Sequence, residues 1–138
     1  EFIKFIGREL QPFIDSNYRT TSEKTLIGQS LGGLLASEIL YKQPELFQHY
    51  LIVSPSLWWD DESLLKYQPD IIKPEFEGNL SIYVAVGKEG KIMENGAKGL
   101  VSILEAYRSN GCVIPQPRPD IPYGHPAQIS AMVTTNGG

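Results

Sequence analysis

The sequence predicts an α/β fold in which a mostly parallel sheet is flanked by helices. Three observations support this prediction. Short apolar runs typical of buried strands occur at residues 25–28, 50–53 and 80–86. Segments with helical spacing of apolar residues alternate with these runs, as in parallel sheets with covering helices. Finally, 138 residues with 41% hydrophobic content suffice for one ordinary core, which predicts a single domain over residues 1–138.

The first element is a helix. Apolar side chains recur near helical spacing over residues 2–14, with polar side chains between them. Pro12 predicts a kink or a stop in this helix, followed by a polar stretch over residues 15–24. Because the helical pattern starts at the first position, we expect the chain to be part of a larger domain that lacks its N-terminal strands here.

The next elements follow from the three apolar runs. The run at 25–28 turns abruptly at Gln29 and Ser30 into an amphipathic helix that ends before Pro44. The second run leads through a Ser-Pro-Ser segment to a short helical piece near residues 60–67. The third stops at Gly87, and a helix is expected from about residue 98 to residue 108.

The C-terminal quarter has a different composition. Five of the ten prolines lie between positions 115 and 126, which disfavours a regular final strand and helix there. Residues 134–138 are expected to be a frayed end.

Composition excludes several function classes. The formal charge of −4, with Lys and Arg scattered along the chain, argues against a nucleic-acid partner. No apolar run approaches the roughly 20 residues of a membrane span. The single cysteine excludes an intrachain disulfide, and two histidines leave little material for a zinc site, so neither a metal nor another cofactor is expected. The compartment (cytoplasmic, or periplasmic or secreted) and the oligomeric state stay open.

The segment from Gly28 to Gly32 matches the pattern G-x-S-x-G, with Ser30 at its centre. An apolar strand enters this motif and a helix leaves it, which is the context of a nucleophile elbow. Side chains at the flanking glycine positions are expected to collide with the neighbouring backbone. Ser30 is therefore the candidate nucleophile, and the backbone N–H of Leu31 is a candidate oxyanion donor at the helix N-terminus.

A serine nucleophile needs a base and a group that orients it. His49 and His125 are the available bases; His125 is favoured because it follows the last expected strand region and lies in a loop. For the acid, the loop after the third strand offers Glu89, with Glu94 as the alternative. Each of these side chains could also be an ordinary surface group.

Together, TLIGQSLGGLLAS (residues 25–37), FQHYLIVSPSLWWD (residues 47–60) and VAVGKEG (residues 84–90) resemble the esterase-D-like or enterochelin (siderophore) esterase-like branch of the α/β-hydrolases. The resemblance covers residues 1–108. It implies an α/β-hydrolase fold and a serine hydrolase that cleaves carboxylic esters of small molecules. Ser30, His125 and Glu89 would be catalytic, although some siderophore esterases use only a serine and histidine pair.

We also expect Gln29 to bind substrate, and the resemblance matches Trp58 and Trp59 to an aromatic pair close to the mouth of the active site. The two tryptophans would line an acyl or aryl pocket, which suits siderophore-type or other bulky esters; alternatively, they cap an edge of the core. In the relatives, a second oxyanion donor lies on a loop that precedes the segment matching the first helix of this chain. Two alternatives to hydrolysis therefore remain: a non-catalytic binding module that retains the elbow, and an acyltransferase to a sugar or lipid hydroxyl.

Overall fold

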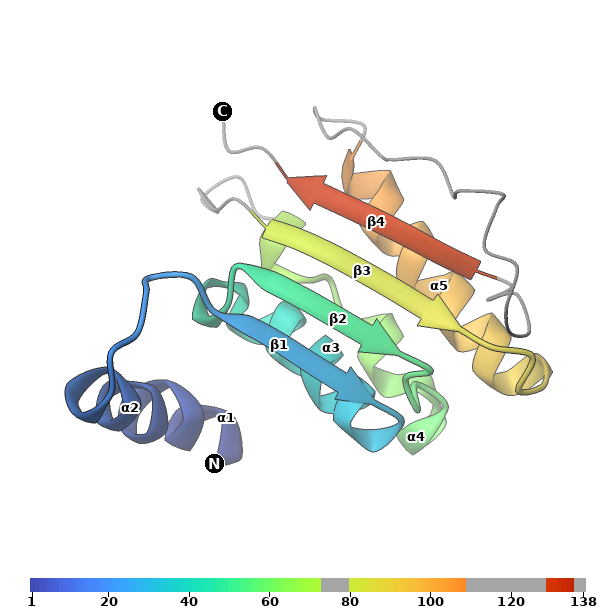
Figure 1. Cartoon of the computed structure of the whole chain (residues 1–138). Coiled ribbons are helices and arrows are strands. Elements are labelled where there is room, and N and C mark those ends of the chain that lie inside the picture. Colours follow the sequence, from blue (N-terminus) through green and yellow to red (C-terminus); the bar gives the residue numbers. More distant parts are fainter. Residues whose placement is uncertain (73–79, 109–128, 136–138) are drawn as a thin grey trace.

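The computed structural model describes residues 1–72, 80–108 and 129–135, in which four strands form one sheet (Figure 1). The strands β1 (Thr25–Gln29), β2 (His49–Val53) and β3 (Leu80–Val86) are parallel, and β4 (Ile129–Thr135) runs antiparallel to β3. Gln29 pairs with Val53, and Val53 with Ala85, so the first three strands end at one edge of the sheet. The predicted mostly parallel sheet is confirmed.

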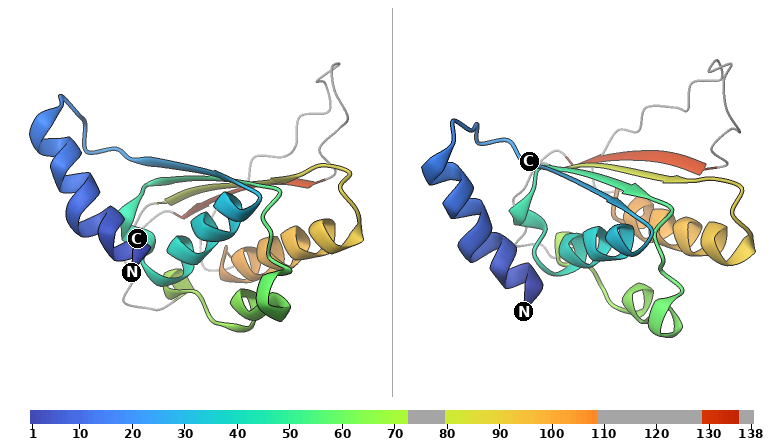
Figure 2. Two further views of the ribbon diagram at one scale, coloured as in Figure 1. Left: turned by 90° about the horizontal axis from the view of Figure 1, so that it is seen from below. Right: turned by 60° about the horizontal axis from the view of Figure 1, so that its bottom comes forward.

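Two long helices, α3 (Leu31–Lys42) and α5 (Lys91–Arg108), cover the same face of the sheet (Figure 2). Alternate strand residues point toward these helices, because successive side chains of a strand point to opposite faces. The fully buried side chains of this core include Tyr50, Ile52, Ile82 and Val84 from the strands, and Ile39, Leu40, Leu100 and Leu104 from the helices.

The expected start of the last helix at residue 98 is wrong, since α5 begins at Lys91. The glycines of this segment favoured a loop in the sequence. In the structure, a Cβ on Gly96 would lie 3.2 Å from Leu57 Cβ, and one on Gly99 would lie 3.2 Å from Leu65 Cδ1. Both glycines therefore permit close packing of the helix rather than ending it.

The expected stop at Pro12 does not occur, because helical structure continues to Asn17. The N-terminal helix runs through α1 (Phe2–Phe5), a π-helical turn η1 (Ile6–Leu10) and α2 (Gln11–Asn17). Proline has no N–H to donate to the preceding turn. That turn is widened, with the Gln11 N–H donating to the carbonyl of Ile6, and the helix continues five residues past Pro12.

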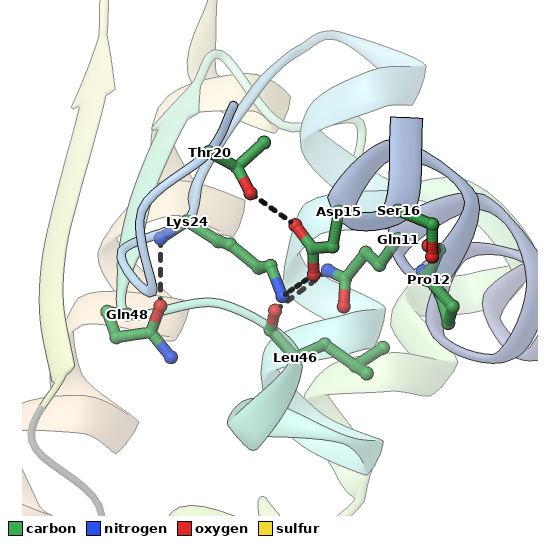
Figure 3. Close-up of polar contacts among 8 residues, drawn as sticks. All are labelled: Gln11, Pro12, Asp15, Ser16, Thr20, Lys24, Leu46 and Gln48. Atoms are coloured by element: carbon green, nitrogen blue, oxygen red, sulfur yellow. Dashed lines mark hydrogen bonds and ion pairs between the residues drawn. The ribbon is translucent and has the colours of Figure 1, made fainter. Parts of the chain in front are cut away.

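Polar contacts tie this helix to the start of the sheet (Figure 3). Lys24 Nζ lies 3.0 Å from Asp15 Oδ2, and Thr20 Oγ1 donates to Asp15 Oδ1 at 2.9 Å. The hydrogen bonds from Lys24 and Thr20 lower the pKa of Asp15 below its ordinary value. On the same side of the helix, Gln11 Nε2 donates to the carbonyl of Leu46 at 2.9 Å. The N-terminal helix is thereby held beside the strand that enters the serine motif.

The expectation of a frayed end from residue 134 onward is wrong for its first two residues. Thr134 and Thr135, expected in a frayed end, belong to β4 and pair with Ser81 and Leu80. The pairing along β3 extends over seven residue pairs and includes these two positions. The proline-rich residues 115–126 lie outside the described residues.

Two buried tyrosines allow a matched test of this core. Tyr41 Oη is buried with no hydrogen-bond partner among the described residues, whereas Tyr50 Oη donates to the carbonyl of Pro44 at 2.9 Å. We expect Tyr41→Phe to raise the free energy of unfolding by about 1 kcal/mol, and Tyr50→Phe to lower it by about 1 kcal/mol. Urea denaturation of both variants checks this, and equal effects of the two substitutions would contradict it.

The same tyrosines predict loss of stability in alkali. Burial raises the pKa of Tyr41 from 10.0 to about 12 and also raises that of Tyr50. The unfolded chain therefore ionises first, and the folded state holds more protons above pH 10. The contribution of these two tyrosines to stability should stay constant below about pH 10 and decrease as the pH rises toward 12. Tyr41→Phe should weaken this decrease.

Candidate active site

Ser30 occupies a strained turn between β1 and α3. Its backbone dihedrals are φ 56° and ψ −118°, a region that costs a non-glycine residue about 1–3 kcal/mol. Three hydrogen bonds hold it there. The Ser30 N–H donates to the carbonyl of Val53 at 3.1 Å, and the Ser30 carbonyl accepts from the N–H groups of Leu34 and Ser56, each at 3.0 Å.

The glycines around Ser30 have different roles. A Cβ on Gly28 would lie 2.1 Å from the carbonyl oxygen of Gly32, so the expected collision occurs there. At Gly32 the expectation is wrong, because a Cβ would meet no described atom within 4 Å. A Cβ on Gly33 would approach Pro55 Cα to 2.9 Å. The tight contacts are thus at Gly28 and at Gly33, where α3 passes the segment after β2.

The Ser30 hydroxyl is not used to cap the helix. A serine at this position commonly accepts a hydrogen bond from an amide of the first turn, but Ser30 makes no such bond. Its Oγ lies instead 3.2 Å from Ser56 Oγ. Leu31 is the first residue of α3, and the amides of a first helical turn have no acceptor within their own helix. An exposed hydroxyl and the positive end of a helix therefore lie together.

Glu89 lies in the loop after β3, at the same edge of the sheet as Ser30. Its Oε1 accepts a hydrogen bond of 2.5 Å from Ser54 Oγ. Ser54 follows β2 directly, is buried, and has a positive φ of 43°. Its N–H donates to the carbonyl of Ala85 at 2.7 Å. Glu94 lies in the first turn of α5, where its N–H donates to the carbonyl of Gly90.

The two histidines are placed differently. His49 begins β2 and pairs with Thr25, at the opposite end of the strands from Ser30. Four residues of strand separate these ends, roughly 13 Å. His49 Nε2 lies 3.1 Å from Glu23 Oε2, so it contacts a surface glutamate and not the elbow. The favoured base, His125, lies outside the described residues.

The two tryptophans are on the surface next to the elbow helix. Trp58 is 44% exposed and Trp59 54% exposed, with ring centroids 5.8 Å apart, so neither caps the core. Trp59 lines a cavity of about 550 Å³ together with Leu34, one turn along α3 from Ser30, and Tyr67. Gln29, the last residue of β1, is exposed immediately before the nucleophile.

The helical piece expected near residues 60–67 is short and irregular. It consists of α4 (Trp59–Glu62) and the 3-10 turn η3 (Ser63–Lys66). Asp60, Asp61 and Glu62 all have positive φ, between 52° and 56°, which breaks a regular helix. This segment carries Trp59 at its start.

The described residues hold no group of three or more His, Cys, Asp and Glu side chains suited to a metal ion. Within the same part of the chain, no helix has the length and apolar character needed to cross a membrane.

Sequence reasoning did not single out Ser54 and Ser56. Both are buried, and together they contact the candidate nucleophile and the candidate acid. The available signal was their position: they follow a strand that neighbours the elbow strand, and parallel strands bring their carboxyl ends to one edge.

Residues 1–108 match the protein family described as "Putative esterase". The chain is 32% identical over 90 residues to the ferri-bacillibactin esterase BesA of Bacillus subtilis, covering 63% of this chain and 31% of that protein. It is 40% identical over 68 residues to a siderophore enterobactin esterase of Emericella nidulans, covering 47% of this chain and 22% of that protein.

Among solved structures, the chain is similar to the BES protein from Bacillus cereus. The TM-score is 0.61 with 34% sequence identity, and the match covers 76% of this chain and 40% of that one. The chain therefore spans well under half the length of the relatives that it matches.

Proposed function

The chain belongs to this esterase family and has its α/β-hydrolase fold; from this premise we propose that it hydrolyses carboxylic esters through an acyl-enzyme on Ser30. The observation that carries the proposal is the backbone conformation of Ser30 together with its exposed hydroxyl group. Its strained backbone is fixed by three hydrogen bonds, and its exposed hydroxyl is not consumed by helix capping. An inert capping serine would need neither feature.

In the proposed mechanism, Ser30 Oγ attacks the ester carbonyl carbon while its proton passes to a base, which we assign to His125. The Leu31 N–H donates to the oxyanion that forms. Collapse of the tetrahedral intermediate breaks the bond to the alcohol, which leaves with the proton from the base. Water then attacks the acyl-enzyme with help from the same base and releases the acid and Ser30.

We propose that the substrates are siderophore-type or other bulky acyl and aryl esters. The relatives named above are esterases of ferri-bacillibactin and enterobactin. The two exposed tryptophans support this assignment, because flat aromatic surfaces suit flat apolar groups. We also propose that Gln29 contacts the substrate beside Ser30.

The test is a rapid-mixing experiment with a p-nitrophenyl ester. An acyl-enzyme mechanism predicts a burst of nitrophenol proportional to the enzyme concentration. A fluorophosphonate probe should label the protein, and the labelled peptide should contain Ser30. Binding of the ester without turnover or labelling would instead support a non-catalytic module, and ester formation with an added alcohol would support acyl transfer.

Glu89 and Glu94 offer a matched test of the acid. We propose that Glu89 orients the base. Glu89→Gln should then lower kcat by roughly tenfold to a hundredfold, because a neutral amide stabilises an imidazolium less well. Glu94→Gln should leave kcat unchanged. Steady-state kinetics at pH 7 checks both variants, and a normal kcat for Glu89→Gln would support a serine and histidine pair acting without an acid.

A further inference from the structure

The segment after β2 surrounds the backbone of Ser30. The carbonyl of Val53 accepts from the Ser30 N–H, and the N–H of Ser56 donates to the Ser30 carbonyl. The two backbone polar groups of Ser30 are therefore bound by residues three apart in one neighbouring segment. Pro55, between them, lies so close to α3 that a Cβ on Gly33 would approach its Cα to 2.9 Å.

The same segment reaches the side chain of Ser30. Ser56 is 2% exposed, and its Oγ lies 3.2 Å from Ser30 Oγ. A buried hydroxyl without a partner destabilises the folded state, so this contact satisfies a group that is removed from water. Two other buried serines are Ser54, which donates to Glu89, and Ser37, which donates to the carbonyl of Gly33 in its own helix.

We propose that Ser56 is a positioning residue for the nucleophile, an inference that rests on the proposed function of Ser30. Its O–H donates to Ser30 Oγ and fixes the rotamer of that hydroxyl. Because Oγ then acts as the acceptor, the Ser30 proton stays available for the base. As negative charge grows on Oγ during proton transfer, the donated hydrogen bond strengthens, since bonds to charged acceptors are the stronger ones.

The hydrogen bond from Ser56 acts in the step in which Ser30 Oγ attacks the ester carbonyl carbon. Once Oγ becomes the ester oxygen of the acyl-enzyme, its charge is lost and the Ser56 hydroxyl binds a weaker acceptor. Ser56 should therefore affect the rate of reaction at Ser30 and have little effect on substrate affinity. A purely structural serine would affect folding stability and leave the rate per folded molecule unchanged.

The test compares Ser56→Ala with Ser37→Ala and Ser56→Thr in the full chain. Ser37 is a matched control, since it is also a buried, hydrogen-bonded serine, but its hydroxyl donates to a carbonyl of its own helix and not to Ser30. The readouts are the second-order rate of fluorophosphonate labelling at Ser30, the rate constant of the nitrophenol burst with a p-nitrophenyl ester, the dissociation constant of that ester from the concentration dependence of the burst, and the free energy of unfolding. Rates are normalised to the folded fraction of each variant.

We expect Ser56→Ala to slow labelling and to lower the rate constant of the nitrophenol burst by about tenfold to a hundredfold with the dissociation constant of the ester unchanged, the equivalent of one hydrogen bond to a developing charge. Ser37→Ala should react at the wild-type rate, and Ser56→Thr should recover part of the rate because it retains the hydroxyl. A Ser56→Ala rate equal to wild type, or an equal decrease in Ser37→Ala, overturns the role of Ser56 while the proposed function stands. Absence of labelling in the wild-type protein overturns both.

Discussion

Replacing Ser30 by alanine is expected to lower kcat for ester hydrolysis by about 10⁴-fold or more and to abolish the nitrophenol burst. The reason is that no second hydroxyl can take its place. Ser56 Oγ is 3.2 Å away but is buried, whereas Ser30 is exposed at the helix N-terminus. Losses of this size are typical when the nucleophile of a serine hydrolase is removed. The measurement is steady-state and rapid-mixing kinetics, combined with mass spectrometry of the probe adduct.

Ser16→Ala is the control for this experiment. Ser16 is exposed on α2, where its hydroxyl bonds to the carbonyl of Pro12 away from the elbow. This variant should retain wild-type activity. If Ser30→Ala kept a substantial fraction of the activity, with the probe attached to another residue, the assignment of Ser30 as the nucleophile would be wrong.

The second large effect is expected from Gly28→Ala. Its Cβ would lie 2.1 Å from the carbonyl oxygen and 2.5 Å from the carbonyl carbon of Gly32, both of them backbone atoms that cannot rotate away. The turn must therefore open, which displaces Ser30 from the segment after β2. We expect a loss of about 3 kcal/mol in the free energy of unfolding, with loss of probe labelling in the molecules that remain folded.

Gly32→Ala is the matched variant in the same motif. Its Cβ meets no described atom within 4 Å, and Gly32 lies in α3, where alanine is the better helix former. The free energy of unfolding should stay the same or rise by up to about 1 kcal/mol. Chemical denaturation of both variants provides the comparison. Equal destabilisation by the two substitutions would contradict the distinct roles of the two glycines.

The elbow could be predicted from the sequence because its determinants are local. An apolar run, a glycine before the serine and a helical pattern after it all lie within some twenty residues, and each favours the same strand-turn-helix unit. Chain order then directed attention to the loop after the third strand, where Glu89 is found at the elbow edge of the sheet. The pairing of His49 with Thr25 places this histidine at the opposite end of the strands from Ser30, which agrees with the preference for His125 over His49.

The remaining features depend on contacts between distant segments. Gly96 and Gly99 resemble loop residues until the packing of Leu57 and Leu65 against α5 is known. Pro12 stays within a helix because a wider turn precedes it, which residue preferences do not reveal. Ser54 and Ser56 acquire partners only through the pairing of β2 with its two neighbours, so nothing in their own segment marks them out.

The register between β1 and β2 also bears on how the fraction of correctly folded molecules in a preparation is measured. A shift of β2 by one residue would exchange the faces of its side chains and bring Pro55, which has no hydroxyl, to the level of Ser56. A molecule with that error could still be compact and helical. The fraction of molecules that bind a stoichiometric active-site titrant therefore measures correct strand alignment, which circular dichroism and hydrodynamic size do not report.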